Sequence, residues 1–193
     1  SDQTTLADEA LAQLRRLIGH SERLQEGFSK LHHNDGAKNQ WVDFRGQKRR
    51  GYHVRQLVSG RRIEWETAPV VFERGQDLCH FCFAGAMGAQ NRRPSLGFNL
   101  LVNGEPTVSF DLVRDLKAWH SPDQTVTLLY YPHLLTRDDS SGFFYVSILR
   151  DRLKSGRPCR LTVQVRGQDS PRWFTLFPER QAVAWQAEIG GTY

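Results

Sequence analysis

The sequence has no long hydrophobic run. No stretch approaches the roughly 18 apolar residues that a membrane-spanning helix requires, and the mean hydropathy of the 193 residues is −0.55. Cysteine is scarce, and repeats and low-complexity segments are missing. A membrane span, a disulfide scaffold and a disordered chain are therefore not expected. The 39% hydrophobic and 11% aromatic content predicts a globular domain with a core.

The three cysteines do not form a convincing metal or redox motif. Cys79 and Cys82 lie three positions apart on a predicted strand, and such positions point to opposite faces. We therefore expect both to be buried as small apolar residues. Cys159 begins another predicted strand, from which it would reach one of them across a sheet. The odd number leaves a free thiol or an intermolecular bond.

Motifs of the common enzyme classes are missing as well. The sequence contains no Gly-x-Ser-x-Gly, no His-Glu-x-x-His, no phosphate loop and no dinucleotide fingerprint. The adjacent His32 and His33 would point in different directions on a helix. These absences make a non-catalytic protein the favoured interpretation.

One pair of carboxylates keeps an enzyme open as an alternative. Glu64 and Glu66 lie two apart on a predicted strand, so both project from one face about 6.6 Å apart. Glycosidases place two carboxylates about 5 to 9.5 Å apart across the scissile bond. The same pair would also suit an exposed face on which acids meet nearby bases. A glycosidase or lyase that uses Glu64 and Glu66 is therefore the second alternative.

The net charge of +5 comes from one stretch of the chain. Seven basic residues and no acid lie between Arg45 and Arg62. Such a basic patch attracts phosphate, sulfate or uronate groups, and it would favour anionic glycans if it lies near the binding site. The other explanation is a solvated loop and strand face. No nucleic-acid-binding motif accompanies the patch, so a nucleic acid partner is not expected.

The first segment of the chain has a helical pattern. Apolar residues from Leu6 to Leu31 follow helical spacing, and the turn-rich residues 32–36 end the pattern. We expect an amphipathic helical arm over residues 1–36, followed by a basic connecting segment over residues 37–50. Residues 5–33 would pack on the next domain, pair with a second copy, or contact a neighbouring domain.

From residue 51 the pattern changes to short strands with turn signals between them. We expect a mainly β, antiparallel β-sandwich of jelly-roll type over residues 51–180 and a tail over residues 181–193. Asn103-Gly104 is a hairpin signal, and residues 138–142 are expected to form a loop. The predicted strands are 52–58, 62–67, 78–84, 96–102, 107–112, 124–131, 143–149, 159–165 and 173–177.

Five stretches of strand and turn have a sequence pattern similar to that of a known class of domain. They are Trp65–Pro69, Phe83–Gly88, Gly97–Glu105, Asp139–Phe144 and Trp173–Leu176. Together they resemble the galactose-binding-like jelly-roll modules that accompany secreted bacterial polysaccharide-processing enzymes. The resemblance covers about residues 50–178 and implies non-catalytic carbohydrate binding, a secreted or periplasmic location and a structural calcium ion. The helical arm and the basic stretch depart from that pattern.

Exposed aromatic and planar polar side chains are the residue types expected in a glycan-binding site. Sugars stack on aromatic rings, and their hydroxyls bond to amides, carboxylates and guanidinium groups. Asp138 and Asp139 would supply oxygen ligands to calcium, or would simply form a turn. The candidates for the glycan site are Trp119, Arg92, Arg93, Asn91, Gln90 and Tyr131.

The sequence thus favours a non-catalytic binding module for a polysaccharide in an extracytoplasmic bacterial protein. The first alternative is a structural or assembly domain that uses the helical arm. No cofactor is expected apart from the structural calcium that the resemblance implies.

Overall fold

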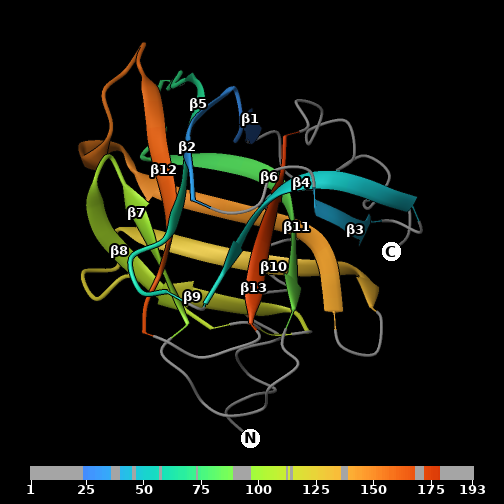
Figure 1. Ribbon diagram of the computed structural model, residues 1–193. Coiled ribbons are helices and arrows are strands. Elements are labelled where there is room, and N and C mark those ends of the chain that lie inside the picture. The colour runs from blue at the N-terminus through green and yellow to red at the C-terminus, as the bar shows by residue number, and fades with distance from the viewer. Residues whose placement is uncertain are drawn as a thin grey trace, which may run out of the picture.

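The computed structural model shows a protein built almost entirely of β-strands (Figure 1). Its one helix is a single 3₁₀ turn, η1 (Arg150–Arg152), among the residues that the structure describes. Within the same residues, no helix has the length and apolar character needed to cross a membrane. The described residues are 24–35, 40–44, 47–56, 58–72, 74–88, 97–111, 113, 115–135, 139–167 and 172–178.

The strands form two sheets. The larger sheet has the order β3-β4-β13-β6-β11-β10-β9, and β1 pairs with β6 beside this path. Its strands are β1 (Leu24–Glu26), β3 (Gln40–Phe44), β4 (Gln47–Arg55), β6 (Leu78–Gly88), β9 (Lys117–His120), β10 (Val126–Leu135), β11 (Asp139–Leu149) and β13 (Trp173–Phe177). The smaller sheet has the order β2-β5-β12-β7-β8. Its strands are β2 (Lys30–Asn34), β5 (Arg62–Pro69), β7 (Phe98–Val102), β8 (Glu105–Phe110) and β12 (Pro158–Val165).

Strand β6 is central to the larger sheet. Along one edge it pairs with β11 over its full length. The other edge is shared by two segments, because β1 pairs with His80–Cys82 and β13 pairs with Ala84–Gly88. The β1 pairing is parallel, whereas the other pairings are antiparallel. Both β6 and β11 bend strongly along their length (Figure 1), which wraps the sheet around the core.

The two sheets share one hydrophobic core. Trp65 of β5 is fully buried, and its ring meets Phe83 of β6 edge-on at 5.2 Å between ring centres. Phe83 in turn stacks on Phe144 of β11. The indole nitrogen of Trp65 donates a hydrogen bond to the carbonyl of Gly27 at 2.6 Å. This shared core is compatible with the predicted β-sandwich.

Most predicted strands are confirmed, and so is the hairpin turn between β7 and β8. At this turn Asn103 and Gly104 have φ angles of 50° and 85°, as a tight hairpin turn requires. The predicted loop over residues 138–142 is wrong from Asp139 onward, because Asp139–Gly142 pairs with β6 and extends β11. Strands β3 and β9 have no counterpart among the predicted strands.

The helical prediction is wrong for residues 24–34, which form β1 and β2. Phe28 and Leu31 fit a helical spacing, but Phe28 is buried in the shared core and Leu31 lies opposite Trp65 in the β2–β5 pairing. Pairing with β6 and β5 therefore outweighs the local periodicity, as tertiary contacts commonly do. Residues 1–23 and the tail over residues 181–193 lie outside the described residues.

Candidate functional site

The predicted glycan-binding residues do not meet in one place. Trp119 lies on the core side of the larger sheet, 5.7 Å from Phe110 between ring centres. Tyr131 packs on the opposite side of the same sheet, beside Leu129 and Tyr145. The sheet therefore separates the two aromatic candidates. Gln90, Asn91, Arg92 and Arg93 lie outside the described residues.

Of the two predicted calcium ligands, the structure describes one, Asp139. Asp139 lies in β11 opposite Gly88 of β6, and Asp138 lies outside the described residues. In the described part of the chain, no group of three or more His, Cys, Asp or Glu side chains is placed to hold a metal ion.

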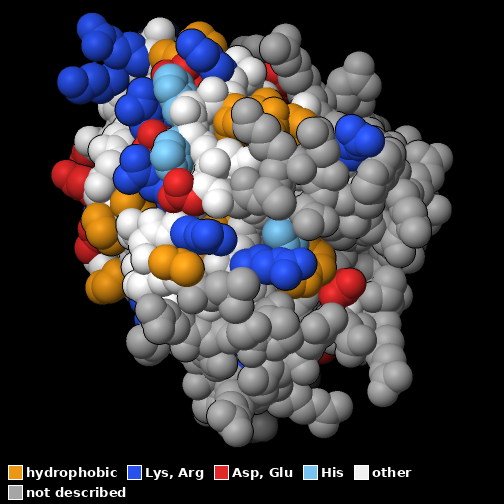
Figure 2. All heavy atoms as spheres, in the orientation of Figure 1, with side chains coloured by type: hydrophobic (Ala, Val, Ile, Leu, Met, Phe, Trp, Pro, Cys, Tyr) orange, Lys and Arg blue, Asp and Glu red, His pale blue; other side chains and the backbone are white. Residues whose placement is uncertain are grey.

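Glu64 and Glu66 do project from one face, as their spacing predicts. Glu66 contacts His32 at 2.7 Å and Arg160 at 3.7 Å, and Glu64 accepts a hydrogen bond from Thr162 at 3.3 Å. We call this outer face of the smaller sheet the ion-paired face. In Figure 2 histidine, acidic and basic side chains lie next to one another over β2 and β5 at the upper left. These contacts favour the interpretation of an exposed face on which acids meet bases.

A β-bulge explains how two adjacent histidines come to this face. The pairing of β2 with β5 shifts between Leu31 and His33, so His32 and His33 both escape the normal alternation. His33 contacts Asp35 at 2.6 Å. The bulge thus allows both histidines to contact carboxylates on the same face, His32 with Glu66 and His33 with Asp35.

The cysteines are free and buried. Cys79 faces the shared core and Cys82 faces the opposite side of β6, as the alternation predicts. Burial raises the pKa of the Cys79 and Cys159 thiols to about 12, and it raises the pKa of Cys82 as well. Thiols with raised pKa values are poor nucleophiles, so none of the three suits covalent catalysis.

His53 is a buried histidine that resembles half of a catalytic pair. Its Nε2 accepts a hydrogen bond from Arg55 at 3.2 Å, so in the neutral ring Nδ1 carries the proton and donates to Thr175 at 2.7 Å. Burial, with a smaller contribution from Arg55, lowers the pKa of His53 to about 4. A ring nitrogen that donates to Thr175 cannot accept its proton. The pair therefore does not activate a nucleophile.

The most developed polar cluster lies at a loop end of the protein. A hollow of about 470 Å³ opens where the β7–β8 turn, the β9–β10 loop and η1 meet. We call it the loop-end hollow. Its size falls within the range of small-molecule sites. It is lined by Val102, Asn103, Glu105, Asp123, Thr125, Leu149, Asp151 and Arg152.

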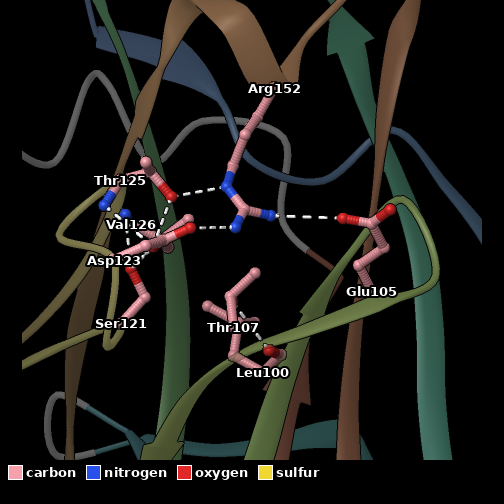
Figure 3. Close-up of polar contacts among 8 residues, drawn as sticks. All are labelled: Leu100, Glu105, Thr107, Ser121, Asp123, Thr125, Val126 and Arg152. Carbon is pink, nitrogen blue, oxygen red and sulfur yellow. Dashed lines mark hydrogen bonds and ion pairs between the residues drawn. The ribbon is translucent and has the colours of Figure 1, made fainter.

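Arg152 organises this hollow (Figure 3). Its guanidinium contacts Asp123 at 2.5 Å, Glu105 at 3.4 Å and the hydroxyl of Thr125. Arg152 is the last residue of η1, which places it here, while the neighbouring Leu149 provides an apolar wall. One guanidinium thus links three separate segments and fixes the shape of the hollow.

Asp123 is held by a dense set of donors. One oxygen accepts from the hydroxyl groups of Ser121 and Thr125, each at 2.7 Å, and from the Thr125 amide at 3.2 Å. The hydrogen bond from Ser121, followed by those from Arg152 and Thr125, holds the pKa of the Asp123 carboxyl well below its usual range. Asp123 is therefore a fixed carboxylate rather than a proton donor.

The lining of the hollow is acidic. Three carboxylates, Glu105, Asp123 and Asp151, face one guanidinium. Among the residues whose side chains the structure describes, none of the basic stretch from Arg45 to Arg62 lines it. Sequence reasoning missed this site, because its residues come from three turns that only the fold brings together. The Asn103-Gly104 turn signal was the one local indication of its position.

Comparisons of the chain with protein families, with curated proteins and with solved structures gave no match. Of the class of domain that the sequence resembles, the structure shows the coarse architecture, a mainly β protein with two sheets.

Proposed function

We propose that the protein is a non-catalytic binding module that takes a neutral glycan in the loop-end hollow. The observation that carries the proposal is the convergence of fixed polar groups on an apolar-walled hollow. Carboxylate and amide oxygens accept hydrogen bonds from sugar hydroxyls, and the partly exposed Leu149 suits the apolar face of a sugar ring. A similar mix of groups is typical of sites that recognise polar, uncharged ligands.

Charge decides between neutral and anionic glycans. Among the described lining residues, a uronate or sulfate group would meet three carboxylates and one guanidinium, which is already bonded to Asp123 and Glu105. Like charges at close range disfavour such a ligand. The sequence-based expectation of an anionic glycan depended on the basic stretch lying near the site, and none of the described side chains of that stretch lines the hollow.

The architecture supports the finer part of the proposal. Two antiparallel sheets over one core, with a polar site among the loops at one end, suit the jelly-roll modules that the sequence resembles. A place in an extracytoplasmic bacterial polysaccharide-processing system, and a structural calcium ion, rest on that resemblance.

Binding of the purified chain to an array of neutral and anionic polysaccharides, with calcium and then with EDTA, tests this proposal. Glu105 is 78% exposed and makes one long contact, so Glu105→Ala should leave the fold intact. We expect it to weaken binding of a neutral glycan about tenfold or more, since a hydrogen bond to a charged group contributes roughly 1.5–3 kcal/mol.

A matched control is Asp77→Ala, which removes an exposed carboxylate outside the hollow. It should bind like the parent chain. Equal binding by Glu105→Ala and the parent would place the site elsewhere, and binding confined to anionic polysaccharides would reverse the charge argument. Failure of every polysaccharide to bind would overturn the glycan proposal as a whole.

A further inference from the structure

The larger sheet has a second hydrophobic cluster on the face turned away from the smaller sheet. We call it the aromatic face. Its residues alternate along β6, β11 and β13 with those that enter the shared core. The cluster consists of Cys82, Ala84, Ala86, Leu129, Phe143, Tyr145, Trp173 and Phe177.

The aromatic face has the shape of a trough. Strand β6 provides a floor of small side chains, Cys82, Ala84 and Ala86. Large side chains stand on both neighbours: Tyr145 lies opposite Cys82 on β11, and Phe177 lies opposite Ala84 on β13. The Trp173 ring closes one end over Gly88, where a methyl group would lie 2.1 Å from the indole nitrogen.

This trough is buried although it faces away from the core. Cys82 is 0% exposed, and Phe143, Tyr145 and Phe177 are each 1% exposed. The described strands all belong to the two sheets, and β3 comes close to β11. We infer that chain outside the described residues supplies the rest of the cover.

Two hydroxyl groups on the aromatic face bear on the nature of the cover. Ser141 and Tyr145 are buried on this face, and among the described residues neither hydroxyl has an oxygen or nitrogen partner. The nearby thiol of Cys82 is only a weak partner for Tyr145. Because buried polar groups are costly when unpaired, the occupant should bring polar atoms as well as apolar ones.

The N-terminal segment has the right position and length. Strand β1 runs parallel to β6 beside His80–Cys82, so residue 23 emerges at the end of the trough opposite Gly88. The floor from Cys82 to Gly88 is about 20 Å long at ~3.3 Å per residue. A helix over residues 6–18 is also about 20 Å long at ~1.5 Å per residue, and residues 19–23 would form the connection.

Its side chains have the right distribution too. At ~100° per residue, the apolar residues of a helix over 6–18 fall on one side, with the charged residues on the other. The apolar side holds Leu6, Ala7, Ala10, Leu11, Leu14, Leu17 and Ile18. Gln13, next to this side, would bring the polar atoms that Ser141 and Tyr145 lack.

We propose that residues 6–18 form an amphipathic helix that lies along the trough and covers the aromatic face. The helix completes the domain as a third layer over the larger sheet. Under this proposal the arm packs on its own domain. It does not pair with a second copy or with a neighbouring domain. The loop-end hollow is not involved, so the two proposals stand or fall separately.

Thiol labelling of the full-length chain tests this arrangement, because Cys82 lies on the trough floor while Cys79 and Cys159 lie in the shared core. Leu14→Asp places a charge on the apolar side of the helix. We expect it to speed maleimide labelling of Cys82 at least tenfold, as read by peptide mass spectrometry. Cys79 and Cys159 should stay protected, which shows that the sandwich remains folded.

The matched control is Ala12→Asp, since Ala12 lies about 160° from Leu14 around the helix and its variant should label like the parent. The proposal would be overturned if Cys82 stayed protected in Leu14→Asp. It would also be overturned if Trp185→Asp, in the tail over residues 181–193, sped the labelling of Cys82 instead. Protection that depends on protein concentration would point to a second copy. If Leu14→Asp exposes all three thiols, Leu17→Ser is read by the same criteria.

Discussion

The outer faces of the two sheets differ sharply, although both sheets bury their inner faces in the same core. The aromatic face of the larger sheet is buried, whereas the ion-paired face of the smaller sheet carries partly exposed His32, Glu66 and Arg160. The burial of single strands shows the same difference. Strand β5 alternates between buried and partly exposed residues, and β6 is buried from Cys79 to Gly88. A strand that is apolar on both faces therefore indicates a sheet covered on both sides.

The largest loss of stability is expected from substitutions of two neighbouring residues on β11. Phe143 lies on the aromatic face and Phe144 in the shared core, and each is about 1% exposed or less. If both faces are interior, Phe143→Ala and Phe144→Ala should each lower the free energy of unfolding by about 3–5 kcal/mol, as measured by urea denaturation. A loss below about 1 kcal/mol for Phe143→Ala alone would show that the aromatic face is open to solvent.

The next test uses the buried His53, on the outer side of β4 beside Trp173. Its pKa is lowered to about 4 in the folded protein, against about 6.5 in the unfolded chain. The unfolded chain binds the extra proton between these values, so stability falls as the pH drops from 6.5 to 4, by roughly 2–3 kcal/mol. His53→Asn keeps a donor for Thr175 and should lose this pH dependence. If the stability of His53→Asn depended on pH in the same way as that of the parent, the pKa of His53 would be the same in the folded and unfolded chains, which contradicts the prediction.

A smaller effect is expected at the loop-end hollow. The pKa of Asp123 is lowered in the folded protein, so its contribution is present above the unfolded value of about 3.9 and is lost as the pH falls further. Asp123→Asn should therefore flatten the acid limb of the stability curve below pH ~4. Arg152→Met should flatten it in part, since the Ser121 and Thr125 donors remain. If the stability of both variants fell with pH below ~4 as steeply as that of the parent, Asp123 would not be held by these hydrogen bonds in the folded protein.

The smallest effect is expected on the ion-paired face. Glu66→Gln weakens the contacts to His32 and Arg160 on a face open to water, and such pairs contribute about 0–1 kcal/mol. Urea denaturation should therefore show a loss of less than about 1 kcal/mol. A loss as large as that of Phe143→Ala would mean that this face is covered too, which would remove the contrast between the sheets.

Local pattern predicted the strands well where one face is polar. Strand β5 alternates in sequence as it does in burial, and the Asn103-Gly104 turn follows from backbone sterics alone. Cys79 and Cys82 were assigned to opposite faces for the same reason. These features depend on neighbours along the chain, so one sequence suffices to find them.

The predictions that were wrong concern residues whose environment is set by partners far away in the sequence. Phe28 and Leu31 have helical spacing, yet their environment is set by β5 and the core. Trp119 and Tyr131 seemed equivalent as aromatic residues near loops, but the register of β9 and β10 places them on opposite sides of a sheet. Arg152, Asp123 and Glu105 meet only because three turns converge. No local rule predicts such meetings.

The shared edge of β6 also has a consequence for the order of events during synthesis. One part of that edge is completed by β1, near the start of the chain, and the other part waits for β13, near its end. Until β13 has left the ribosome, Ala84–Gly88 presents unpaired backbone groups on an apolar strand. Such edges invite association with other chains. Nascent chains that stop before Trp173 should therefore be the species most in need of a chaperone.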